Sequence, residues 1–370
     1  MYNSINKWMN FSLYTKKKDY NDLIEEIDTR TKFLMNKHEI VGYSIALIRD
    51  GEIIWAKGYG IRNKEKQLPV TEETVFEAAS LTKPLMAYAA LKLVEEGLLD
   101  LDKSLTSYLA KPYLKNQPQQ EQITARHVLT HSTGFPNWGK VRYSPKIFFT
   151  PGERFSYSGE GFMYLQKVLE EITGQNLDTI IQEKVLKPLG LTKASLLWKE
   201  EYEETAAEGY LKNGLLKNKW KPKKEEAAGS LSISPIDYAK FVISLMDQSK
   251  KSESLLSNEK IKEMLKPAIP VNDAGLSNKH DIPNSEITES KSTFWGLGVG
   301  LEKIDTNYNF WHWGNNTSFQ NLIFANPKDK SGIVIMSNSE KAPLIWKELL
   351  NLTMKGDHPG FDWLMSFYWD

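Results

Sequence analysis

The chain has 370 residues, of which 41% are hydrophobic and 25% charged, an ordinary composition for a folded globular protein. Its 47 Lys and Arg residues are balanced by 47 Asp and Glu residues, so no net charge draws it toward nucleic acid or an anionic membrane. It contains no cysteine, which excludes disulfides, thiol catalysis and cysteine-ligated metals. The length suggests two or three domain-sized units, or one large fold with a subdomain.

The N-terminal segment lacks the apolar core of a secretory signal peptide, and no run approaches the roughly 18 apolar residues of a membrane-spanning helix. We therefore expect no transmembrane segment, and a cytoplasmic location if the chain begins at its natural start. A chain trimmed of a leader would equally suit the cell envelope or the exterior, so the compartment stays open. The basic stretch at 217–226 ends in acids and is typical of a solvated surface.

The first predicted elements are a helix and a β-hairpin. Apolar residues recur with helical spacing over residues 19–37, at Tyr20, Leu23, Ile24, Ile27 and Leu34. Two β-rich runs follow, joined by Asp50-Gly51, a dipeptide typical of two-residue hairpin turns. The glycines at 58–60 indicate a strand end and not a phosphate loop, because no helix follows them.

The middle of the chain has mainly helical patterns. Residues 81–96 predict a helix that Gly97 ends. Residues 100–230 indicate helices and loops with little strand character. The polar stretch 249–292 has few apolar anchors, and we expect it to be a long surface excursion.

Strand patterns return near the C-terminus and are followed by one helical run. The four β-rich runs span residues 294–304, 308–314, 318–327 and 331–339, and the helical run spans residues 343–354. We therefore predict an α+β fold, with one antiparallel sheet built from both ends of the chain and covered by the terminal helices. A mostly helical subdomain would be inserted, and the active cleft would lie between the two parts.

These patterns divide the chain into three predicted parts. Residues 1–20 form an extension, and residues 21–355 form the main domain. Within that domain the sheet takes about 21–75 and 290–355, and the helical part takes about 76–230. Residues 356–370 form an aromatic segment, which we call the C-terminal tail. We expect this tail to dock on the protein's own surface or on a second subunit, so a homo-oligomer is left open.

Ser80 and Lys83 are candidates for a nucleophile and its base. A serine hydroxyl is a poor nucleophile near neutral pH and needs a neighbouring base. At the start of a helix, residues three apart share a face, so the Lys83 amine can reach the Ser80 oxygen. Burial would lower the pKa of Lys83 toward the neutral form that a base requires. The competing interpretation is that Ser80 only caps the helix and Lys83 is solvated.

Two later residues could complete the site. Tyr157 lies in a turn before an amphipathic helix, and near a lysine ammonium it could become a phenolate that shuttles a proton. His312 lies on a predicted strand, with Trp313 alternating to the opposite face. Gly314 would let a substrate approach the strand backbone. Each of these residues could equally be an ordinary core residue.

Three motifs that begin at Ser80, Tyr157 and His312 stand in the order and rough spacing of a known active site. With them the sequence resembles the serine β-lactamase-like, penicillin-recognising hydrolases, in particular class C β-lactamases, DD-peptidases and family VIII carboxylesterases. The surrounding segments at 123–138, 151–162 and 227–241 resemble the family patterns TxRHLLTHTSGL, PGxxFxYSNxGY and AGGLxSTxxDLARF. The resemblance covers about residues 22–345, nearly the whole chain.

The resemblance implies a role for each motif residue. Ser80 would attack a carbonyl and form an acyl-enzyme, while Lys83 and Tyr157 would share the acid and base work in a division left open. The backbone N–H groups of Ser80 and Asn315 would form the oxyanion hole. His312 would contact the substrate or assist Tyr157. Further substrate contacts would come from Gly159, Trp313 and Gly314.

Two departures from the family pattern bear on the substrate. Gly159 stands where the Tyr-x-Asn motif has an asparagine, so the side-chain amide that contacts a β-lactam or peptide amide is absent. His312 replaces the lysine of a KTG motif, which weakens a permanent positive charge for gripping a carboxylate. We therefore expect a serine hydrolase acting on a small ester or a D-amino-acid-type amide, with at most weak β-lactamase activity. The alternative is a catalytically silent binding or scaffolding protein.

No cofactor or metal is expected. His127 and His131 are spaced i and i+4, but no glutamate follows in the HExxH manner, and the segment matches a structural part of the family. The expected partner is a small-molecule or peptide-like substrate.

Overall fold

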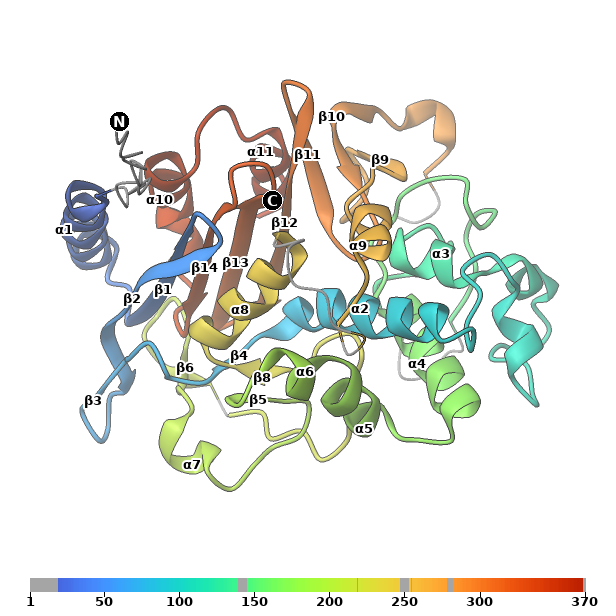
Figure 1. Ribbon diagram of the computed structural model, residues 1–370, viewed down its shortest axis with the longest axis horizontal. Helices are drawn as coiled ribbons and strands as arrows, with labels where there is room; N and C mark the ends of the chain where they lie inside the picture. Colours follow the sequence, from blue (N-terminus) through green and yellow to red (C-terminus); the bar gives the residue numbers. More distant parts are fainter. Residues whose placement is uncertain are drawn as a thin grey trace, which may run out of the picture.

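A computed structural model describes residues 19–138, 145–217, 219–246, 253, 255–277 and 282–368. Nearly all of the predicted N-terminal extension lies outside these ranges. The main feature is a nine-stranded sheet in the order β3-β2-β1-β14-β13-β12-β11-β10-β9, with every neighbouring pair antiparallel (Figure 1). Its strands are β1 (Gly42–Arg49), β2 (Glu52–Asn63), β3 (Leu68–Pro69), β9 (Ile269–Asn272), β10 (Glu289–Trp295), β11 (Gly300–Ile304), β12 (Asn307–Asn316), β13 (Phe319–Asn326) and β14 (Ser331–Ser337).

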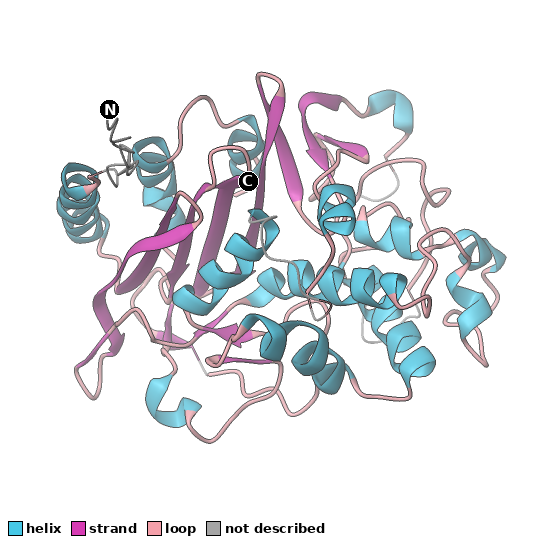
Figure 2. Cartoon of the chain, viewed as in Figure 1, coloured by secondary structure: helices cyan, strands magenta, loops and turns pink. Residues whose placement is uncertain are grey.

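The α+β class and the sheet built from both chain ends are confirmed, because β1 pairs directly with β14. The helices cluster around this sheet and in the middle of the chain (Figure 2). They are α1 (Asn21–His38), α2 (Thr82–Glu95), α3 (Ala125–Leu129), α4 (Gly159–Thr173), α5 (Leu177–Ile181), α6 (Lys187–Leu189), α7 (Tyr202–Thr205), α8 (Pro235–Met246), α9 (Asn258–Met264), α10 (Trp346–Thr353) and α11 (Pro359–Met365).

The β1–β2 hairpin forms where Asp50-Gly51 predicted it. Both turn residues have positive φ, 52° and 78°, which suits the right-handed twist of the flanking strands. The near-continuous apolar run of β1 is explained by burial on both faces of the sheet. Ile45 and Leu47 join one core cluster, while Ala46 and Ile48 join the other.

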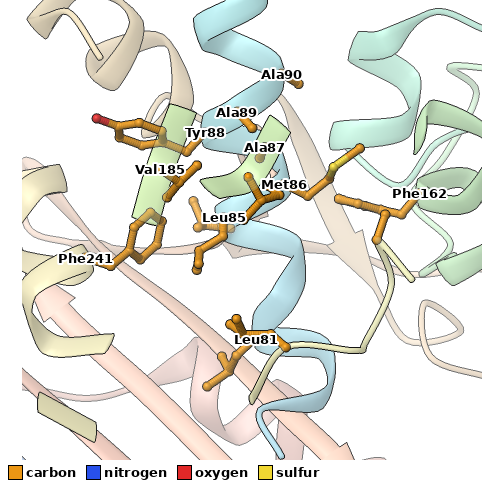
Figure 3. Close-up of a cluster of buried hydrophobic side chains, with 14 of the residues drawn as sticks. Leu81, Leu85, Met86, Ala87, Tyr88, Ala89, Ala90, Phe162, Val185 and Phe241 are labelled. Carbon is orange, nitrogen blue, oxygen red and sulfur yellow. The ribbon is translucent and has the colours of Figure 1, made fainter. Parts of the chain in front are cut away.

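Helices cover both faces of the sheet. α1 and α10 contact each other, and α10 contacts β14, whereas α8 contacts β1, β2 and β14 on the other face. The cluster of Ala46 and Ile48 also contains α2, which is buried along nearly its whole length. Figure 3 shows side chains of α2 surrounded by Phe162, Val185 and Phe241 from three other elements. Ser80 therefore precedes a helix that is held rigidly in the core.

Small strands occur in the middle region, which the sequence predicted as helices and loops. Three of them, β4 (Phe76–Glu77), β8 (Ser232–Ile233) and β5 (Ala194–Ser195), form a separate sheet, and β6 (Gly209–Tyr210) pairs with β7 (Leu216–Lys217). Short 3₁₀ or π turns complete the structure: η1 (Ala79–Leu81), η2 (Leu105–Tyr108), η3 (Pro118–Gln122), η4 (Gln182–Leu186), η5 (Asn284–Glu286) and η6 (Ala342–Ile345). Strands of two residues are too short to produce an alternating pattern in the sequence.

The prediction of a surface excursion over 249–292 is wrong for much of that stretch. Its described residues include α9 and β9, and β10 begins within it, so the main sheet extends beyond the predicted limit at residue 290. Leu256, Ile261, Met264 and Val271 are buried and anchor the segment. These few apolar residues do not stand out in a polar stretch, yet they are enough to anchor a helix and an edge strand.

Within the described residues, no helix combines the length and apolar character needed to span a bilayer.

Candidate active site

Ser80 lies in η1, immediately before α2. Ala79 has a φ of 50°, an uncommon backbone conformation for a non-glycine residue, and it turns the chain sharply at the candidate nucleophile. Lys83 and Ala79 are buried, whereas Ser80 is partly exposed. Ser80 makes no capping hydrogen bond to the start of α2, so the interpretation as a helix cap is wrong.

Hydrogen bonds from distant parts of the chain hold this turn. Tyr238 Oη donates to the Leu81 carbonyl at 2.9 Å, and the Ala78 N–H donates to the Leu231 carbonyl at 2.8 Å. Thr82 Oγ1 accepts from the Leu231 N–H at 3.0 Å. The segment 227–241 therefore supports the nucleophile, which explains its place in the family pattern.

Lys83 is completely buried and points its amine at Ser80, the candidate nucleophile. Its Nζ is 2.9 Å from Ser80 Oγ and 2.7 Å from the Ala228 carbonyl oxygen. Burial disfavours the ammonium form and lowers the pKa of Lys83 from its ordinary 10.5 to about 7. A neutral Lys83 can accept the Ser80 proton, whereas the Ala228 carbonyl, which the sequence did not single out, keeps the amine in place.

Tyr157 is placed beside both residues by the turn before α4. Lys83 Nζ lies 5.0 Å from the centroid of the Tyr157 ring, and the Tyr157 N–H donates to the Gly275 carbonyl at 2.8 Å. Burial raises the pKa of Tyr157, an effect that the neighbouring Ser80 side chain only partly opposes. The phenolate suggested by the sequence is therefore not favoured, because burial outweighs the effect of the Ser80 side chain. Tyr157 is a neutral phenol and can donate a proton.

His312 lies in the middle of β12 with its ring 6.2 Å from that of Tyr157. Burial, together with the nearby Lys83, lowers the pKa of His312 to about 3, so the ring is neutral near pH 7. Its Nδ1 lies 2.7 Å from the Trp313 carbonyl oxygen, which can only accept, so Nδ1 carries the proton. Nε2 is then a buried acceptor with no partner among the described residues. The position offers a hydrogen-bond acceptor and not a permanent positive charge.

His131 is a site residue that sequence reasoning missed. Its ring stacks on Tyr157 with 4.2 Å between centroids, and its Nδ1 accepts from the Ser158 N–H at 2.9 Å. Nε2 therefore carries the ring proton, as a buried donor without a partner in the described chain. Burial, followed by the positive fields of Lys83 and His312, lowers the pKa of His131. In the sequence, His131 stood out only because it lies in the segment 123–138 that resembles a family pattern, and that resemblance did not reveal its contact with Tyr157.

The i, i+4 spacing does not bring His127 and His131 into a common site. His127 instead forms a capping box with Thr124 at the start of α3. Within the described ranges, no three His, Asp or Glu side chains are grouped as metal ligands.

The structure shows a packing role for Gly314, which differs from the approach of a substrate that the sequence predicted. A Cβ at this position would lie 2.0 Å from the Ala78 carbonyl oxygen, so β12 packs against the chain just before Ser80. Trp313 is only 7% exposed, and its ring lies 4.9 Å from that of Tyr157 and 5.3 Å from that of His312. Its observed contacts are thus with the catalytic candidates, and direct contact with a substrate remains a prediction.

Gly159 lies beside Asn137, a second residue that sequence reasoning missed. A Cβ at Gly159 would lie 2.9 Å from the Asn137 carbonyl oxygen and 3.3 Å from its Oδ1. Asn137 Oδ1 accepts from the Gly159 N–H at 3.1 Å. A carboxamide from another loop therefore occupies space next to the position where the family motif has its asparagine.

The end of β12 leaves one side of its backbone open. β12 pairs with β11 only as far as Trp311, so residues 312–316 have no strand partner on that side within the described chain. Asn315, the predicted second oxyanion donor, is exposed at this strand end. The arrangement brings Ser80, Lys83, Tyr157 and His312 together as the motifs predicted.

We expect kcat/KM to rise with pH through one ionisation near pH 7 and to level off above it. Lys83 must be neutral to act as a base, and its pKa is about 7. The pKa of His312 is about 3 and that of Tyr157 is raised, so neither titrates between pH 5 and 9. A pH–rate profile with a soluble ester tests this. A flat profile over that range would contradict Lys83 as the base.

The β-lactamase family model matches residues 23–348. The chain belongs to the β-lactamase family. This confirms the resemblance drawn from the three motifs, and members of this family are serine hydrolases. The fold is likewise the β-lactamase/transpeptidase-like fold, with its large antiparallel sheet and flanking helices.

Several known proteins of this kind are similar to the chain. Protein flp of Staphylococcus aureus strain MRSA252 is 25% identical over 351 residues, covering 89% of this chain and 66% of its own length. Esterase EstB of Burkholderia gladioli is 29% identical over 203 residues, covering 47% of this chain and 51% of its own. The octameric penicillin-binding protein homologue from Pyrococcus abyssi has a TM-score of 0.73 and 28% identity, covering 89% and 77% of the two chains. The chain thus spans just under two thirds of the flp sequence.

Proposed function

We propose that this chain is a serine hydrolase that forms an acyl-enzyme at Ser80 on a small ester or a D-amino-acid-type amide. The observation that carries the proposal is the 2.9 Å contact between Ser80 Oγ and the buried Lys83 amine, whose pKa of about 7 makes it a usable base. The likeness to an esterase, EstB, supports the reaction class.

Acylation follows from the protonation states of three side chains. Neutral Lys83 takes the Ser80 proton as Oγ attacks the substrate carbonyl carbon. The resulting oxyanion accepts hydrogen bonds from the backbone N–H groups of Ser80 and Asn315. Tyr157 donates its phenolic proton to the leaving group, and the Lys83 ammonium returns a proton to Tyr157. The C–O or C–N bond to the leaving group breaks, which leaves the acyl-enzyme and a neutral Lys83.

Deacylation runs through the same groups in reverse. A water molecule gives a proton to neutral Lys83 as its oxygen attacks the acyl carbon, because the Tyr157 phenol already holds its own proton. Ser80 recovers that proton when its bond to the acyl group breaks. His131 keeps the Tyr157 ring in place by stacking on it, and His312 offers nearby an acceptor nitrogen that is unpaired within the described part of the chain.

The electrostatics at His312 favour an ester over a β-lactam. A β-lactam or a peptide C-terminus brings a carboxylate, which a neutral imidazole binds less strongly than a lysine would. The amide at Asn137 replaces only part of the missing motif asparagine, because its Oδ1 is already bound to the Gly159 N–H. Esters need neither contact, so they suit this site best.

The test is a substrate panel of p-nitrophenyl esters, nitrocefin and D-Ala-D-Ala peptides, run with wild type and Ser80→Ala. We expect the short-chain esters to be hydrolysed best. The kcat/KM for nitrocefin should be about 100-fold lower, since the protein lacks the asparagine and the lysine that would recognise a β-lactam. Nitrocefin as the best substrate would contradict the preference. Binding of penicillin without turnover of any substrate would favour the silent binding protein instead.

A further inference from the structure

The C-terminal tail docks on the protein's own surface and is fixed at three points. At its start, the buried Glu302 carboxylate accepts from His358 Nδ1 at 2.9 Å and from the Gly360 N–H at 3.0 Å. A third donor, Asn309 Nδ2, completes the set at 2.8 Å. A buried carboxylate with three donors is a costly arrangement to break, so the start of the tail is firmly attached to β11 and β12.

The middle of the tail packs beside the turn that carries Tyr157. Trp363 Nε1 donates to the Asn272 carbonyl at 2.8 Å, and its ring lies 5.8 Å from that of Phe155. Asn272 Nδ2 in turn donates to the Phe155 carbonyl at 2.8 Å. The middle of the tail thus contacts the chain two residues before Tyr157.

The end of the tail reaches the candidate oxyanion site. Tyr368 Oη donates to Gln320 Oε1 at 2.9 Å, and Gln320 Nε2 donates to Asn315 Oδ1 at 3.0 Å and to the Thr317 carbonyl at 2.7 Å. The Tyr368 ring packs on Trp346 with 5.7 Å between centroids. Burial raises the pKa of Tyr368, and the Asn315 side chain opposes that shift. The Tyr368 hydroxyl is thus linked to Asn315 through the Gln320 side chain.

The turn between β12 and β13 depends on this contact. Gln320 is only 2% exposed, so its Oε1 would be buried without a partner if the Tyr368 hydroxyl were lost. Thr317 has a φ of 59°, an uncommon conformation that its surroundings must maintain. On the opposite side, Lys217 Nζ donates to the Asn316 carbonyl at 2.8 Å. The orientation of Asn315 is therefore set by Gln320 on one side and by the Lys217 contact on the other.

We propose that Tyr368 is a positioning residue for the oxyanion site, acting through Gln320 to fix Asn315, so that the C-terminal tail is part of the catalytic apparatus. This inference rests on the proposed function, since it assigns Asn315 as an oxyanion donor. Oxyanion donors contribute only when they point at the developing charge, so a small rotation of the strand end lowers the rate without preventing substrate binding.

The test compares Tyr368→Phe with Ser366→Ala, a hydroxyl deletion in the same tail whose group donates to the Trp363 carbonyl. Tyr368→Phe keeps the packing on Trp346. We expect Tyr368→Phe to lower kcat about tenfold and to keep KM within about twofold of wild type. The variant should also bind phenylboronic acid, which mimics the tetrahedral intermediate, more weakly by a similar factor. Ser366→Ala should leave both unchanged. Gln320→Met should show the same loss, and the double variant should lose little more.

A structural readout separates failure of this inference from failure of the proposed function. Hydrogen exchange of the peptide 313–324 should be faster in Tyr368→Phe than in Ser366→Ala, whether or not any substrate is turned over. Equal exchange and equal kinetics in the two variants would overturn the inference. A raised KM with unchanged kcat would also overturn it, because Tyr368 would then contact the substrate directly. Wild type without any Ser80-dependent turnover would instead refute the proposed function.

Discussion

Replacing Ser80 by alanine is expected to lower kcat/KM for every substrate by about 10³-fold or more, because it removes the hydroxyl that Lys83 would deprotonate. Ser80 is partly exposed while Lys83 is buried beneath it, so the variant removes the accessible oxygen that would carry the acyl group. The fold should be unaffected, since Ser80 caps no helix. Initial rates and thermal unfolding of the purified variant measure both effects.

The matched control for this variant is Ser107→Ala, which removes an exposed hydroxyl that donates to the Ser104 carbonyl. Its activity should equal that of wild type. Residual activity of Ser80→Ala within about tenfold of wild type would place the nucleophile elsewhere.

Replacing Lys83 by methionine is expected to lower kcat by about 10²- to 10⁴-fold, the usual contribution of a general base. The variant should keep a folded structure, because methionine fills much of the same volume in the core. Near neutral pH its stability should match or exceed that of wild type, since a buried ammonium is costly to hold without a charged partner. Kinetics and urea unfolding at pH 7 test both statements.

The pH dependence of stability gives an independent check on Lys83. Its pKa is about 7 in the folded protein against an ordinary 10.5, so the unfolded chain binds one more proton between these values. The free energy of unfolding of wild type should therefore rise with pH from about 7 to 10, relative to Lys83→Met. A constant difference between the two proteins over this range would contradict a depressed pKa.

Lys92 offers a control on the same helix. It is also buried, but its Nζ contacts Glu95 Oε2 at 3.0 Å and the carbonyls of Glu253 and Leu255, each at 3.0 Å. Lys92→Met leaves these acceptors unpaired, so we expect lower stability and unchanged kcat. The opposite outcomes at Lys83 and Lys92 distinguish a catalytic lysine from a structural one.

The sequence predicted the parts of the site that short motifs encode. The spacing of Ser80 and Lys83 placed both at the start of one helix, and the structure puts the amine 2.9 Å from the hydroxyl. Tyr157 and His312 lie in motifs more than 150 residues apart. The order and spacing of the family motifs were enough to predict that the two side chains meet. Local patterns also gave the β1–β2 hairpin, because Asp50-Gly51 fixes a turn within four residues.

Contacts between distant segments could not be predicted in this way. The pKa of Tyr157 depends on burial among aromatic rings from several elements, and no local pattern reports it. Asn137 fills space beside Gly159 through a loop geometry that the spacing of residues does not determine. The sequence suggested that the aromatic tail would dock, but only the fold brings Tyr368 next to Gln320.

The most direct test of an acylating Ser80 is intact-protein mass spectrometry after a brief reaction with p-nitrophenyl butyrate and an acid quench, followed by peptide mapping. We predict one butyryl group on the peptide that contains Ser80, and none on the Ser80→Ala protein. Turnover without any adduct, or an adduct at another residue in wild type, would contradict the acyl-enzyme at Ser80.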